Sequence, residues 1–77
     1  MKGADVAALA WVRAACASGD ALRIRTAAAI TLAEMAAACD VAKGSVSRWE
    51  HGRRNPTGPP ALAYAKLLRS LQKAKAA

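Results

Sequence analysis

The stretch TLAEMAAACDVAKGSVSRWE, residues 31–50, is the most informative about the fold. It contains a helix start, a turn and a second helix in close succession. It opens with a capping box. In such a box the Thr31 hydroxyl accepts a helix N–H, and the Glu34 carboxylate reaches back to the N–H of Thr31. An apolar helical run follows this start. The stretch therefore predicts a helix over residues 32–39.

Asp40 marks a turn after this helix, since aspartate is one of the few non-glycine residues that tolerate a left-handed conformation. A second helix is predicted over residues 43–51. Ala36 is small enough to let the second helix cross closely, and Val46 is the apolar residue by which that helix packs back. A helix, a short turn and another helix form a helix-turn-helix, whose second helix belongs in the major groove of DNA.

Three more helices are expected around this pair. The first covers residues 6–17 and is capped by Asp5. The next covers about 21–29 and is capped by Asp20, and the last covers 59–73. The chain therefore reads as five helices in succession.

Composition favours the same fold class. The chain has 77 residues, of which 55% are apolar, and more than half of the apolar ones are alanine. Phenylalanine is absent and strict alternation is almost absent, so strands are not expected. We therefore predict an all-α, compact five-helix helix-turn-helix domain that spans residues 1–77 as one unit.

Charge is divided unevenly along the chain. Residues 1–40 carry four basic and four acidic side chains, whereas residues 41–77 carry eight basic and one acidic. The net charge of +7 therefore belongs to the second half, which indicates a face built for a polyanion. The alternative is a solvated basic surface with no partner.

The first helix is apolar on more than one side. Leu9, Val12 and Cys16 share one side, and Trp11 points the opposite way. One interpretation is a core helix with a single exposed aromatic residue. The other is that residues 6–17 pack on the domain with one side and on a second subunit with the other, which predicts a homodimer.

The two cysteines do not indicate a metal site. Cys16 and Cys39 have no CxxC or Cys/His spacing of the kind that binds zinc, and Cys39 is expected as a buried free thiol. No metal and no cofactor is predicted. The apolar run near the N-terminus is too short for a membrane span and is interrupted by Arg13, so neither a membrane association nor a signal peptide is expected.

Three segments together carry a family resemblance: Leu32-Ala-Glu34-Met35-Ala36, Asp40-Val41 and SVSRWEHGRRNP at residues 45–56. With them, residues 22–68 resemble the phage-repressor/Cro-type (Xre-like) helix-turn-helix family. The resemblance implies a five-helix fold that binds operator DNA, usually as a two-fold dimer. Residues 1–19 lie outside it.

The resemblance also implies roles for individual residues. Base-reading side chains are expected at Lys43, Gly44, Ser47 and Arg48. Phosphate contacts are expected from Thr31, Leu32, Ser45, His51, Arg53, Arg54 and Asn55. A structural ion pair is expected between Arg25 and Glu50. General chemistry agrees, because helix N-termini bind phosphate and arginine can contact a guanine edge through two hydrogen bonds.

Two positions depart from the family pattern. Ala42 stands where a capping serine, threonine or aspartate would normally begin the second helix. Gly44 stands where the family commonly reads a base, and glycine inside a helix costs about 0.5–1 kcal/mol. Either the helix start lies too close to DNA for a side chain, or this position reads nothing.

These observations predict a small, sequence-specific regulator of repressor or Cro type that binds double-stranded DNA. It is expected to be cytoplasmic and nucleoid-associated, in a bacterium or phage. The alternative is an antitoxin, or another partner-binding protein on the same fold, that autoregulates its operon. A DNA binder without sequence preference is a third possibility. An enzyme is not expected, because the chain has one histidine and no paired carboxylates or glycine-rich phosphate loop.

Overall fold

The computed structural model describes residues 1–76, which form five α-helices and no strand. The all-α prediction is therefore confirmed for this part of the chain. In chain order the helices are α1 (Gly3–Ser18), α2 (Asp20–Ala27), α3 (Leu32–Cys39), α4 (Lys43–Glu50) and α5 (Gly58–Ala76). None of the helices within residues 1–76 is both long and apolar enough to cross a membrane.

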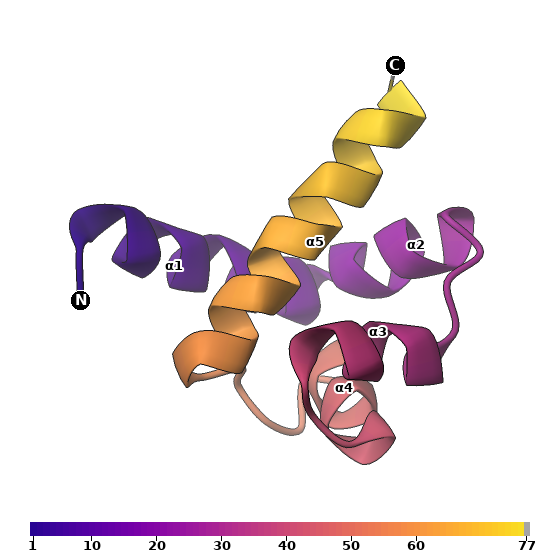
Figure 1. Ribbon diagram of the computed structural model, residues 1–77, viewed down its shortest axis with the longest axis horizontal. Coiled ribbons are helices and arrows are strands. Elements are labelled where there is room, and N and C mark those ends of the chain that lie inside the picture. Colours follow the sequence, from indigo (N-terminus) through magenta and orange to yellow (C-terminus); the bar gives the residue numbers. More distant parts are fainter. Residues whose placement is uncertain (77) are drawn as a thin grey trace.

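The long helix α5 organises the domain. It runs diagonally across the molecule with α1 passing behind it, while α3 and α4 lie together along the lower edge (Figure 1). Helix α5 packs against α1, α2 and α3, and α3 packs closely on α4. The helix-turn-helix pair is therefore held at one edge of a bundle to which α1 contributes.

The start of α3 has the predicted capping box. The Thr31 hydroxyl accepts the N–H of Glu34 at 3.0 Å, and the N–H of Thr31 donates to Glu34 Oε1 at 2.9 Å. At the other end of α3, Asp40 adopts the left-handed conformation with φ 58° and ψ 45°. Its N–H donates to the carbonyl of Ala37, so the chain turns at once into α4. Both predictions for this segment are confirmed.

The core is one cluster to which every helix contributes. Trp49 of α4 packs on Tyr64 of α5, with ring centroids 4.9 Å apart. Val46 is fully buried, and Ala36 is buried where α3 meets α4. The predicted inner side of α1 is buried as well, and both cysteines are buried free thiols. The residues predicted to face inward are confirmed.

The start of α1 differs from the sequence-based expectation. Asp5 is not the cap, because α1 begins at Gly3 and its N-cap residue is Lys2, which places Asp5 inside the first turn. An N-cap residue lies outside the helix, and here Lys2, whose backbone is extended, takes that position.

Helix α2 also differs at both ends. Asp20 is its first helical residue and pairs with Arg23 instead of capping, while Gly19 takes the N-cap position. Gly19 has φ 87°, so it ends α1 and begins α2 without an intervening loop. Helix α2 stops at Ala27, because Ala29 turns the chain with φ 60°.

Trp11 is partly covered by the rest of the chain. It is half-buried against the core, and the Arg69 guanidinium lies 4.7 Å from its ring centroid. This cation–π contact joins α1 to α5 within one chain. Trp11 is therefore not the exposed aromatic residue that one interpretation expected, and packing of this side of α1 on a second subunit stays a prediction.

Candidate nucleic-acid interface

Helix α4 divides sharply into an inner and an outer side. Val46, Trp49 and Glu50 are buried, whereas Lys43 and Arg48 are exposed and Ser47 is half-exposed. The helical period explains the division, because residues three and four apart share a face. The side chains predicted to read bases are thus those that α4 presents outward.

Gly44 and Arg48 form one unit on the outer side of α4. A Cβ atom placed on Gly44 would lie 3.5 Å from Nη1 and 3.6 Å from Nη2 of Arg48. The guanidinium therefore lies over the glycine, one turn toward the N-terminus of the helix from its own Cα atom. Among the described residues no carboxylate pairs with Arg48, so its charge is available at the start of α4.

The N-terminus of α4 has unused hydrogen-bond donors. Its N-cap residue, Ala42, supplies no side-chain hydrogen bond, and the first backbone donor to find a carbonyl is the N–H of Ser45. The N–H groups of Lys43 and Gly44 therefore remain open to an acceptor. Together with the exposed Lys43 side chain, they give the helix start an affinity for anions.

The N-terminus of α3 is occupied differently. Its capping box uses the N–H groups of Thr31 and Glu34, and these bonds from Thr31 hold the pKa of the Glu34 carboxyl below its usual value. The N–H groups of Leu32 and Ala33 are left for an outside acceptor. A phosphate here could accept the N–H of Leu32, and the Thr31 hydroxyl, which accepts the N–H of Glu34, still has its O–H to donate.

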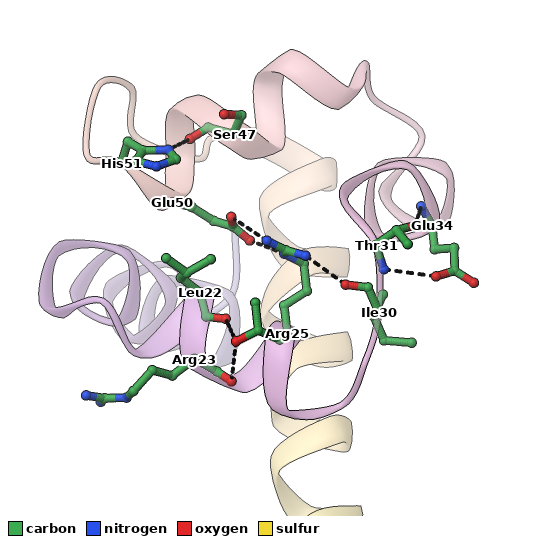
Figure 2. Close-up of polar contacts among 10 residues, drawn as sticks. Leu22, Arg23, Arg25, Ile30, Thr31, Glu34, Ser47, Glu50 and His51 are labelled. Atoms are coloured by element: carbon green, nitrogen blue, oxygen red, sulfur yellow. Dashed lines mark hydrogen bonds and ion pairs between the residues drawn. The ribbon is translucent and has the colours of Figure 1, made fainter.

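His51 ends α4 and faces the loop that follows. Its Nδ1 lies 2.8 Å from the carbonyl oxygen of Ser47 (Figure 2). A hollow of about 170 Å³ is lined by Ser47, Arg48, His51 and Arg53. The outer side of α4 is thus continuous with the basic loop.

The loop between α4 and α5 exposes Arg53, Arg54 and Asn55. Gly52, with φ 69°, turns the chain at its start, and the N–H of Arg53 donates to the carbonyl of Arg48 at 2.9 Å. Pro56 is fully buried and anchors the far end of the loop.

Arg13 of α1 contacts this loop and was not identified from the sequence. Its Nε donates to the carbonyl oxygen of Pro56 at 3.0 Å, across 43 residues of chain. No sequence signal joins the two positions, because the spacing along α1 indicated only an interruption of its apolar run.

Arg25 and Glu50 are brought together beneath the interface. Arg25 Nε donates to Glu50 Oε2 at 2.5 Å and Nη2 donates to Oε1 at 3.1 Å, while Nη1 donates to the carbonyl of Ile30 at 2.7 Å (Figure 2). Hydrogen bonding to the Glu50 carboxylate raises the pKa of the Arg25 guanidinium. The pair ties α4 to α2 and removes the one carboxylate of α4 from the outer surface.

The phosphate contacts expected from the sequence form two groups. In Figure 2, Thr31 lies on one side of the Arg25–Glu50 pair, and His51 lies on the other, beside Ser47, which was predicted to read bases. The second group continues into the basic loop. Nowhere in residues 1–76 do three or more histidine, cysteine or acidic side chains gather as a metal ion would require.

Comparison with known proteins gives one match. A family model described as helix-turn-helix matches residues 22–72, which is well over half of the chain. No curated protein and no solved structure matches. The matched range includes α3, α4 and most of α2 and α5, and it leaves α1 outside.

Proposed function

Because the chain belongs to the Cro/C1-type helix-turn-helix family and is a DNA-binding regulator of that type, we propose that α4 enters the major groove of a specific operator. In this proposal Arg48, Lys43 and Ser47 contact base edges. The loop residues Arg53, Arg54 and Asn55 contact phosphates next to those bases. His51 and the N-terminus of α3 contact further phosphates.

The distribution of charge carries the proposal. Residues 41–76 contain a single carboxylate, that of Glu50, which is buried and bonded to Arg25. Within residues 41–76, the outer side of α4 and the loop after it therefore present arginine, lysine and histidine and no exposed acidic side chain. Such a surface attracts the phosphate backbone, and arginine and lysine can also bind the acceptors of guanine in the major groove.

Repression is proposed to follow from occupancy. The helices serve the DNA-binding fold, so the chain would act by blocking an operator rather than by catalysis. One module binds weakly, and two related by a two-fold axis would reach half-sites about 34 Å apart.

The homodimer is proposed to use the N-terminal half of α1. Val6 of α1 is 55% exposed, and Met1, which precedes the helix, is 78% exposed, so the start of α1 has apolar surface that no other part of the described chain covers. The same surface favours the second candidate function, binding of a toxin or another protein partner. In the homodimer a second copy of the chain would cover Val6, whereas in the second candidate function a different protein would cover it.

Selection from a random pool of double-stranded DNA tests the main proposal. We expect a palindrome with half-sites separated by about one helical turn, and an affinity that falls steeply with salt. Enrichment of no sequence at all would favour the DNA binder without sequence preference and would contradict the operator.

A further inference from the structure

The loop after α4 is held by few interactions of its own. Once the N–H of Arg53 has bonded to Arg48, residues 54–57 make no backbone-to-backbone hydrogen bond to the rest of the described chain. Arg54 and Asn55, two of the proposed phosphate contacts, are exposed within this segment.

Two contacts hold this loop at Pro56. The proline ring is fully buried, and its carbonyl oxygen accepts the hydrogen bond from Arg13 Nε at 3.0 Å. Arg13 is half-buried on α1, outside residues 22–72 that the family model matches. The bond therefore links a helix beyond the family's shared part to the loop that holds the backbone contacts.

We infer that Arg13 is a positioning residue for DNA binding, which acts by fixing the loop before DNA arrives. The inference rests on the proposed function, because it assumes that Arg54 and Asn55 contact phosphates. Ordering a loop at the moment of binding costs conformational entropy, and a loop already ordered in the free protein avoids that cost. Helix α1 is on this account part of the DNA-binding unit.

The competing explanation is that Arg13 contacts a phosphate directly. Substitution of Arg13 by glutamine distinguishes this explanation from the positioning role. The amide nitrogen of glutamine stands at the same place along the side chain as Nε of arginine. Arg13→Gln therefore keeps a donor for the Pro56 carbonyl and removes the positive charge. Arg13→Ala removes both.

Binding to the selected operator is measured for each variant across a range of salt concentrations. Arg13→Ala is expected to bind about two- to tenfold more weakly, as for loss of one hydrogen bond. Arg13→Gln is expected to bind nearly as the parent does, with an unchanged salt slope. A direct phosphate contact predicts the opposite: Arg13→Gln binds weakly and its salt slope falls by about 0.9. Arg23→Ala is the control, since it removes an exposed arginine of α2.

A double-mutant cycle tests whether Arg13 acts through the loop. In a chain that already has Arg54→Ala and Asn55→Ala, the further change Arg13→Ala is expected to weaken binding hardly at all. An undiminished effect in that background would overturn the inference, because Arg13 would then act without the loop residues.

Backbone order parameters of the free protein give a readout that needs no DNA. Residues 54–57 are expected to be ordered in the parent and in Arg13→Gln, and mobile on the nanosecond timescale in Arg13→Ala. Unchanged order in Arg13→Ala would overturn the inference even if operator binding succeeds. If the loop responds as expected but the parent binds no DNA, the proposed function fails and the structural role of Arg13 stands.

Discussion

Arg25 and Glu50 face each other through two parallel hydrogen bonds, although 25 residues separate them in the chain. Both are buried, and the remaining Arg25 contact goes to the carbonyl of Ile30. The pair thus joins α2, the segment before α3, and the end of α4. It fixes the angle at which the outer side of α4 is presented.

Breaking this pair should be costly. Glu50→Ala leaves the buried guanidinium without its partner, which is expected to lower the free energy of unfolding by about 3–5 kcal/mol. The double variant Arg25→Met/Glu50→Leu removes both charges and is expected to recover most of that loss. Urea denaturation followed by tryptophan fluorescence measures both. A double variant no more stable than Glu50→Ala would show that the charge left behind is not the cause.

Arg48 and Arg53 should affect binding in different ways. Arg48→Ala is expected to lose about 1–3 kcal/mol of discrimination at one base pair, because a bidentate contact to guanine is removed. Arg53→Ala is expected to weaken all sequences alike and to reduce the salt slope by about one. Titrations against the operator and its single-base variants distinguish these effects. Base readout by Arg48 is wrong if both variants lose affinity uniformly.

Gly44 should tolerate a methyl group but not a longer side chain. The added Cβ of Gly44→Ala would meet Arg48 Nη1 at 3.5 Å, an ordinary contact, so the guanidinium need not move. This variant is expected to gain about 0.5–1 kcal/mol of stability and to keep its base preference. The longer side chain of Gly44→Leu would occupy the position of the Arg48 guanidinium and displace it. This variant is therefore expected to change the preferred base. Identical preferences in both variants, measured by selection, would contradict this.

The capping box of α3 predicts a pH dependence. Hydrogen bonds from Thr31 lower the pKa of Glu34 in the folded protein, so the carboxylate stabilises the fold at neutral pH. This contribution is lost as the pH falls through the lowered pKa. The stability gap between the parent and Glu34→Gln should therefore shrink between neutral pH and about pH 3. Thermal unfolding at several pH values measures the gap, and a constant gap would contradict the assignment.

The proposed dimer is tested by a charge on α1. Val6→Glu places a carboxylate on the exposed apolar surface and is expected to convert the dimer to a monomer in sedimentation equilibrium. Ala74→Glu adds the same charge at an exposed position of α5 and should leave the mass unchanged. Deleting residues 6–17 would not serve, because Leu9, Val12 and Cys16 belong to the core. If the parent protein itself sediments as a monomer, the proposed homodimer is wrong.

Local chemistry explains which parts of the fold were predictable. The capping box of Thr31 and the left-handed turn at Asp40 depend on neighbouring residues alone, and both are present. The caps expected at Asp5 and Asp20 failed because a cap depends on where the helix begins, and in each case the helix includes the aspartate. Alanine-rich segments give no sharp start.

The candidate site was predictable to a different degree. The residues of α4 that point outward follow from helical period, and the partner of Glu50 came from the family resemblance. The contact of Arg13 with Pro56 could not be foreseen, since it depends on how α1 packs rather than on any local pattern. The position of the Arg48 guanidinium over Gly44 is likewise a property of the folded chain.

The two buried thiols allow local unfolding of the domain to be measured by thiol labelling. Cys16 lies on α1 and Cys39 on α3, and burial raises the pKa of each above its ordinary value. A thiol reagent can therefore reach them only when the surrounding helices separate. Equal labelling rates at the two positions would mean that α1 and the helix-turn-helix open as one cooperative unit. Faster labelling of Cys16 would give the free energy at which α1 leaves while the rest stays folded.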